Sequence, residues 1–177
     1  AISYRLFVSD EKRRSGPLPA IIYLHGGGGI GIDNLKQISG GNTTGTHVWV
    51  TPEAQARHPA FVIAPQLPSG NRWDDQGADG LAPYAQLVVE LLESLSQEFA
   101  IDRDRIYLTG QSLGGYGTWD LITKRPDLFA AAIPLCGEGM PSRAAAATAA
   151  SILTVLSTTE YSLCRRRWTK DGSFISG

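Results

Sequence analysis

Short apolar runs recur along the chain, and their spacing predicts its secondary structure. Five of these runs have the length of a β-strand: 4–8, 20–24, 60–64, 105–109 and 130–135. Runs that are apolar on both faces are typical of parallel strands covered by helices on each side. Glycine and proline are spread between the runs and form no single linker, so we expect no domain boundary.

Two segments between these runs have helical spacing. Apolar residues repeat at helical intervals from Leu87 to Phe99, and Pro83 suits a first turn, which predicts an amphipathic crossover helix. A second helix is expected over about 113–124, ended by the Arg125-Pro126 step. This alternation predicts a single α/β domain over 1–177, with a mostly parallel sheet and helices on both faces.

Two other regions are less regular. Residues 26–45 are glycine-rich and polar, which favours a long functional loop over a helix. After Pro141, the alanine-rich stretch 144–150 is a candidate helix and 152–156 a candidate strand. Residues 161–177 have no clear period, so no element is predicted there.

Composition and charge exclude several classes of protein. The 177 residues are 42% hydrophobic and 19% charged, with a net charge of −1, so nucleic acid is not an expected partner. No apolar run is long enough for a membrane span, and residues 1–10 lack a signal-peptide pattern. The chain has no starting Met, which is compatible with removal of an upstream export signal. The two cysteines make neither a disulfide framework nor a zinc pattern, and we expect Cys136 to be a small core residue.

A serine motif stands between a predicted strand and a predicted helix. Residues 110–114 read Gly-Gln-Ser-Leu-Gly, of the form G-x-S-x-G. At a tight strand-to-helix turn the serine Oγ is exposed, and the flanking positions must be glycine because side chains there would collide with the strand and helix. The N–H of Leu113 then points to where an oxyanion develops during acyl transfer. We predict Ser112 as a nucleophile; the alternative is a glycine-rich turn without chemistry.

A second glycine-rich motif, His25-Gly26-Gly27-Gly28-Gly29, follows the second predicted strand. Backbone N–H groups without side chains can approach a carbonyl oxygen closely, so Gly27 or a neighbour could supply a second oxyanion donor. The glycines also fit the dinucleotide fingerprint G-x-G-x-x-G, but no acidic residue ends a following strand at the required distance. A phosphate-binding P-loop is disfavoured because no Lys-Ser or Lys-Thr follows.

Together these residues resemble the α/β-hydrolase superfamily, within it the small esterases and predicted peptidases related to feruloyl esterases and polyhydroxyalkanoate depolymerases. The resemblance covers roughly 4–147, and leaves 148–177 as an atypical tail. The blocks that carry it are Leu24-His25-Gly26, Asp33-Asn34, Ala64-Pro65-Gln66, Arg72-Trp73, Ile101-Asp102, 105–110, 114–119 and 125–137. It implies the α/β-hydrolase fold, Ser112 as nucleophile, Leu113 with the Gly26 and Gly27 backbone as oxyanion hole, and no cofactor or metal. It also favours an extracellular location.

The chain departs from this family in the rest of its catalytic triad. In α/β hydrolases an acid and then a histidine follow the serine, whereas all three histidines here precede Ser112. The resemblance gives His25 a structural role in the loop, and the polar surroundings of the other two histidines, His47 and His58, predict surface positions. None of the acidic residues after the serine lies in the sequence context of the family's catalytic acid, so none is assigned that role. These acids are Asp120, Asp127, Glu138, Glu160 and Asp171, of which we expect Asp120 and Asp127 to be solvated. The C-terminal part is therefore expected to be truncated or out of frame after about Ala150.

The leading hypothesis is a serine carboxylic-ester hydrolase that forms an acyl-enzyme on Ser112, with weak activity because no base is found. A serine peptidase on the same fold uses the same acyl chemistry and remains open. A catalytically silent binding or assembly module is the third hypothesis. Aromatic residues that could line an acyl pocket are Trp49, Trp73, Tyr116 and Trp119, although aromatic side chains are more often core. Missing strands would leave an unpaired sheet edge, from which we expect a homo-oligomer.

Overall fold

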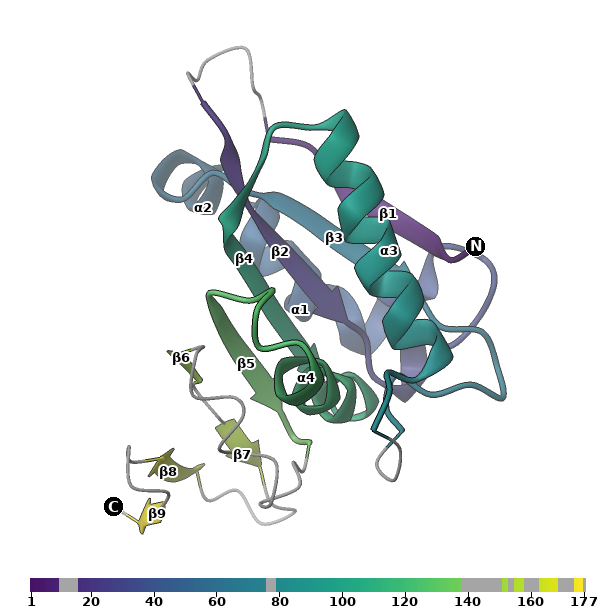
Figure 1. The fold of residues 1–177 in the computed structure, drawn as a ribbon, viewed down its shortest axis with the longest axis vertical. Helices are drawn as coiled ribbons and strands as arrows, with labels where there is room; N and C mark the ends of the chain where they lie inside the picture. Colours follow the sequence, from purple (N-terminus) through teal and green to yellow (C-terminus); the bar gives the residue numbers. More distant parts are fainter. Residues whose placement is uncertain are drawn as a thin grey trace.

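The computed structural model describes residues 1–9, 16–75 and 79–137, together with the backbone of short strands between 151 and 176. These residues form a sheet in the order β1-β3-β2-β4-β5-β7-β8-β9, with β6 beside β5 (Figure 1). Strands β3, β2, β4 and β5 are parallel, and β1 pairs antiparallel with β3. The main strands are β1 (Ser3–Phe7), β2 (Leu18–Leu24), β3 (Phe61–Gln66), β4 (Ile101–Gln111) and β5 (Ala131–Leu135).

Helices lie on both faces of the sheet. Figure 1 shows α3 (Pro83–Glu98) and α4 (Leu113–Lys124) in front of the sheet, and α1 (Thr43–Val50) and α2 (Pro52–Arg57) behind it. The core gathers apolar side chains of β2, β3 and β4 with those of α3 and α4. Its fully buried members include Ile22, Leu24, Ile63, Leu108 and Leu121.

The five strands and two helices predicted in the first 137 residues are confirmed, as is the mostly parallel α/β fold. Helix α4 has the predicted bounds, and α3 ends one residue earlier than expected. Strand β3 was expected to stop before Pro65, but it continues through Pro65 to Gln66. Among the described residues, no helix is long and apolar enough to cross a membrane.

Helices α1 and α2 were not predicted, and the loop expected over 26–45 already enters α1 at Thr43. Helix α1 buries only Thr46 and α2 buries no residue, so neither has the apolar stripe that reveals a helix in a sequence. A local signal for α2 does exist. Thr51 caps it by accepting a hydrogen bond from the N–H of Ala54 at 3.2 Å, and Pro52 occupies its first turn.

The C-terminal region differs from its prediction. The candidate strand 152–156 corresponds to two shorter strands, β6 (Ser151–Ile152) and β7 (Val155–Ser157). Two antiparallel strands, β8 (Leu163–Trp168) and β9 (Phe174–Ser176), occur where no element was expected. The candidate helix 144–150 lies outside the described residues.

Candidate active site

Ser112 occupies the turn between β4 and α4. Its backbone has φ 52° and ψ −115°, a conformation that costs a non-glycine residue about 1–3 kcal/mol. The turn is held on both sides: the N–H of Ser112 donates to Leu135 O at 2.8 Å, and its carbonyl accepts from Gly115 N at 2.8 Å. The residue is exposed, and none of the described side chains hydrogen-bonds its Oγ. The strained backbone therefore presents a free hydroxyl at the carboxyl end of the sheet.

Glycines make this turn possible by letting backbone pack on backbone. A Cβ atom at Gly110 would overlap the carbonyl of Gly114, and one at Gly114 would overlap the carbonyl of Leu24 at the end of β2. A Cβ at Gly115 would overlap the carbonyl of Leu135. This turn, residues 110–115, is called the elbow. It packs between the ends of β2 and β5, which brings it beside the glycine-rich loop that follows β2.

His25 begins that loop and is fully buried. Its Nδ1 donates to Gly26 O at 2.6 Å, and its Nε2 accepts from the N–H of Leu67 at 3.0 Å, which fixes a neutral ring with a proton on Nδ1. The ring meets Trp73 edge-on with centroids 5.2 Å apart, and Trp73 Nε1 donates to His25 O at 3.2 Å. Burial lowers the pKa of His25, which the Gly26 hydrogen bond partly offsets. Both ring nitrogens are occupied, so His25 holds the loop and is not a base.

The two glycines predicted as oxyanion donors differ in what their backbone does. The Gly26 N–H donates to Asn42 Oδ1 at 3.0 Å, and its carbonyl accepts from Gly29 N at 2.9 Å. Gly26 is therefore not available as a donor, which corrects that part of the prediction. Gly27 is exposed and its N–H meets no acceptor among the described residues, while its carbonyl accepts from Ile30 N at 3.2 Å.

Leu113 is the first residue of α4. The first N–H groups of a helix have no acceptor within the helix, and they carry the positive end of its dipole. The Ser112 carbonyl accepts from Gly115 N and from Tyr116 N at 3.1 Å, whereas the Leu113 N–H has no acceptor among the described residues. Beside it, Gln111 Nε2 donates to Gly41 O at 3.2 Å, and a Cβ at Gly26 would lie 3.3 Å from Gln111 O. The elbow and the glycine-rich loop are therefore in contact.

A buried glutamine fixes the outer part of the loop. Gln66 Nε2 donates to Gly29 O at 3.1 Å and to Asp33 Oδ1 at 2.9 Å, and Gln66 Oε1 accepts from Asn34 N at 2.6 Å. Hydrogen bonds from Gln66 and then from the Lys36 and Leu35 backbone hold the pKa of Asp33 well below its usual range. Gln66 and Asn42 are the site residues that the sequence did not identify, although Gln66 and Asp33 belong to blocks of the family resemblance.

The described acids and histidines supply no base for Ser112. His47 and His58 are exposed, as predicted, on α1 and at the end of α2. Asp127 is exposed as expected and pairs with Arg125 at 2.9 Å. Of the other candidates, Glu138, Glu160 and Asp171 lie outside the described residues.

Asp120 was expected to be solvated, and this prediction is wrong. Its side chain is buried and pairs with Lys124 Nζ at 2.7 Å, one helical turn along α4. Burial raises the pKa of Asp120. The helical spacing i, i+4 brings the two charges together in the interior, and hydrogen bonding between them offsets part of the cost of burial.

The prediction that Cys136 is a core residue is also wrong. Cys136 is exposed, with φ 53°, immediately after β5.

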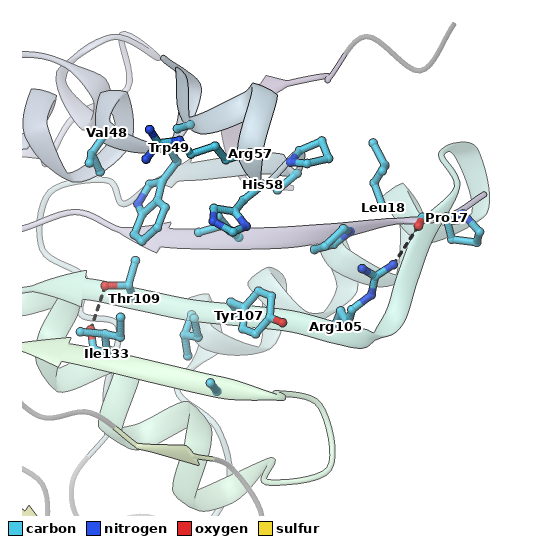
Figure 2. A pocket seen from close by; sticks show the side chains of 17 residues that line it. Pro17, Leu18, Val48, Trp49, Arg57, His58, Arg105, Tyr107, Thr109 and Ile133 are labelled. Atoms are coloured by element: carbon cyan, nitrogen blue, oxygen red, sulfur yellow. Dashed lines mark hydrogen bonds between the residues drawn. The ribbon is translucent and has the colours of Figure 1, made fainter. Parts of the chain in front are cut away.

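A cavity of about 920 Å³ lies elsewhere, between the sheet and the helices α1 and α2. Figure 2 shows Trp49 and His58 reaching toward Thr109 and Tyr107 across it. Ser112 does not line this cavity. Of the other predicted aromatic residues, Trp73 is core and Trp119 Nε1 donates to Gly137 O at 3.2 Å. Within the described part of the chain, no group of His, Cys, Asp or Glu side chains could hold a metal ion.

Known proteins share both this fold and the sequence around it. The sequence profile described as the prolyl oligopeptidase family matches residues 69–161, more than half of the chain. A thermostable esterase of known crystal structure is 39% identical, with a TM-score of 0.80 over 86% of this chain and 42% of that protein. The poly(3-hydroxyalkanoate) depolymerase C of Paucimonas lemoignei is 30% identical over 45% of this chain and 21% of its own length. The ferri-bacillibactin esterase BesA of Bacillus subtilis (strain 168) is 26% identical, over 67% and 36% respectively.

The chain spans less than half the length of each of these relatives. The expected resemblance to α/β hydrolases related to depolymerases and feruloyl esterases is confirmed; a ferulic acid esterase shares the fold with a TM-score of 0.55 at 17% identity. With an α/β-hydrolase fold and a profile match over more than half of its length, the chain belongs to the prolyl oligopeptidase family.

Proposed function

We propose that the chain is the nucleophile-bearing part of a serine carboxylic-ester hydrolase. The observation that carries this proposal is Ser112: an exposed serine held at φ 52° between a strand and a helix, with no structural use for its hydroxyl among the described residues. Backbone strain of this kind persists where function needs it. The relatives named as esterases agree with an ester substrate.

In this mechanism Ser112 Oγ attacks the ester carbonyl carbon and forms a tetrahedral oxyanion. The N–H groups of Leu113 and Gly27 hold the negative oxygen, and collapse expels the alcohol and leaves an acyl-serine that water hydrolyses to the acid. No cofactor takes part in these steps. The Oγ proton needs an acceptor, and no described side chain provides one. Loss of the histidine of such a triad costs on the order of 10⁶-fold in turnover, so we expect weak hydrolysis by the 177-residue chain.

The test is labelling with a fluorophosphonate probe, followed by p-nitrophenyl acetate hydrolysis. We expect slow labelling of the wild-type chain and of Ser69→Ala, an exposed serine in the loop after β3, and none of Ser112→Ala. Labelling that survives Ser112→Ala would remove the nucleophile assignment. Brisk ester hydrolysis that Ser112→Ala abolishes would show that the chain holds a base, which separate His47 and His58 substitutions would locate.

Two other functions have specific support. The family's description favours a serine peptidase, and rates on an ester and on a peptide amide of the same acyl group would separate the two activities. The lack of a described base next to Ser112 favours a catalytically silent module, for which the probe should leave Ser112 unlabelled.

Self-association through a sheet edge is a further part of the proposal. The edge expected from missing strands is paired, since β6 and β7 lie beside β5. At the opposite edge, β1 pairs only with β3 among the described strands, and its last residue Phe7 and the following Val8 are 36% and 42% exposed. An edge of this kind is a template for pairing with a second copy. Light scattering across a dilution series should show a dimer or a larger species, and a monomer at every concentration would count against it.

A further inference from the structure

Asn42 sits at the centre of the contacts that shape the glycine-rich loop. It ends a short 3-10 turn (Gly40–Asn42) and is 2% exposed. Its Oδ1 accepts from Gly26 N at 3.0 Å and from Tyr23 Oη at 3.4 Å, and its Nδ2 donates to Lys36 O at 3.2 Å. The side chain therefore joins Tyr23 near the end of β2, Gly26 at the start of the loop and Lys36 on the loop's far side.

The same turn also touches the elbow. Gly41, the residue before Asn42, accepts the hydrogen bond from Gln111 Nε2, and Gln111 directly precedes the serine. Residues 41 and 42 thus bridge the glycine-rich loop and the elbow, through a contact between residues 70 positions apart in the sequence. Any shift of this turn would change the spacing between the elbow and the loop.

We propose that Asn42 is a positioning residue for the oxyanion site: it accepts the Gly26 N–H and holds the loop so that Gly27, whose N–H has no acceptor among the described residues, can donate to the oxyanion. An amide side chain suits this place because one oxygen accepts two hydrogen bonds while the nitrogen donates a third. Tyr23 supports the arrangement because its buried hydroxyl donates to the same Asn42 oxygen.

Two neighbouring glycines of the loop have different roles: the Gly26 backbone is engaged within the protein, and the Gly27 N–H has no acceptor among the described residues. The Gly26 backbone is fully used within the protein, by Asn42 on its N–H and by His25 and Gly29 on its carbonyl. Gly27 follows with its N–H unpaired among described residues and with open space where a Cβ would lie. The inference rests on the proposed function, because a positioning role has a consequence for catalysis only if Ser112 reacts.

The first measurement is independent of reactivity. Amide hydrogen exchange in the unliganded chain should show a protected Gly26 and a fast-exchanging Gly27. Asn42→Leu, which removes every polar contact at similar size, should speed Gly26 exchange at least about tenfold, the effect of losing one modest hydrogen bond. Asn42→Asp, which keeps the acceptor, should retain part of the protection.

The second measurement is the rate of fluorophosphonate labelling. Ser112 Oγ forms a bond to phosphorus as fluoride leaves, its proton passes to solvent, and the phosphoryl oxygen takes the place of the oxyanion. We expect Asn42→Leu to slow labelling about 10–100-fold, since misplaced donors lose most of their effect. The matched control is Thr46→Val, at a buried residue four positions after Asn42 whose hydroxyl donates to the Asn42 and Thr43 carbonyls. It should label at the wild-type rate.

The outcomes separate the inference from the proposed function. Unchanged Gly26 exchange in Asn42→Leu would overturn the inference, as would equal slowing in Asn42→Leu and Thr46→Val, which would indicate general loosening. If neither the wild-type protein nor any variant is labelled, the proposed function fails. Amide exchange at Gly26 and Gly27 still decides whether Asn42 holds the Gly26 N–H in a hydrogen bond while the Gly27 N–H stays free.

Discussion

The two glycine-rich turns of this protein use glycine for opposite reasons. In the elbow, Gly110, Gly114 and Gly115 lack side chains because the backbones of β2, β5 and α4 occupy that space. In the loop after β2, Gly27 and Gly28 have open space or only a distant neighbour where a Cβ would lie. Glycine thus serves packing throughout the first turn, whereas in the loop it leaves access at Gly27 and Gly28 and serves packing only at Gly29, against the His25 ring. The sequence alone shows the same residue in both turns, so substitutions are the direct way to test the difference.

The largest effect is expected for Gly114→Ala. The new methyl group would overlap the Leu24 carbonyl at the end of a central strand, and backbone on both sides cannot move aside. We expect the free energy of unfolding to fall by more than about 3 kcal/mol, measured by urea denaturation. A loss below 1 kcal/mol would mean that the elbow is not packed as tightly as described.

Gly29→Ala should rank second. Its Cβ would collide with the His25 ring, which is a side chain but is pinned by Gly26 and by the Leu67 N–H. Overpacking of this kind costs about 1–3 kcal/mol. Combining it with His25→Ala should reduce the additional loss, and full additivity in a double-mutant cycle would contradict the contact.

His25 also predicts a pH dependence of stability. Because its pKa is lowered in the folded protein, the unfolded chain binds more protons below about pH 6.5, so stability is lost as the pH falls through this window. The slope cannot exceed about 1.4 kcal/mol per pH unit for one proton. His25→Gln should flatten the slope in urea denaturation between pH 5 and 8; an unchanged slope would assign it to other groups.

Ser112→Gly should stabilise the fold while it removes the nucleophile. Glycine adopts φ 52° and ψ −115° without the strain that a serine carries, which favours the variant by about 1 kcal/mol. Thermal denaturation measures the gain, with Ser112→Ala as the control that removes the hydroxyl and keeps the strain. A Ser112→Gly variant no more stable than Ser112→Ala would show that the turn stores no strain.

The smallest effect is expected for Gly27→Ala. Its backbone does not require a positive φ, and no atom lies within 4 Å of the new Cβ. The free energy of unfolding should change by less than about 1 kcal/mol, with a small gain from the restricted unfolded chain. A loss of 2 kcal/mol or more would erase the distinction between the two turns.

The sequence predicted the parts of the structure that depend on local pattern. The five strands, α3 and α4 follow from apolar runs and helical spacing, because each of these elements packs apolar side chains on the core, those of β1 being only partly buried. Helices α1 and α2 bury almost nothing and left no such pattern, and the residues of β8 pair without an apolar period. The position of Ser112 between β4 and α4 was also predictable from local sequence, because the G-x-S-x-G motif and the turn consist of the same few residues.

By itself, then, the sequence determined the alternating strands and helices and the place of the serine, because short-range sterics and burial decide both. Only the tertiary structure decided which backbone groups around the serine are free. Hydrogen bonds between distant segments engage two of these groups: the Gly26 N–H donates to Asn42, and the Leu67 N–H donates to the His25 ring. The tertiary fold also buries Asp120 and exposes Cys136. No local pattern encodes these outcomes, since each depends on how the sheet and its helices pack against one another.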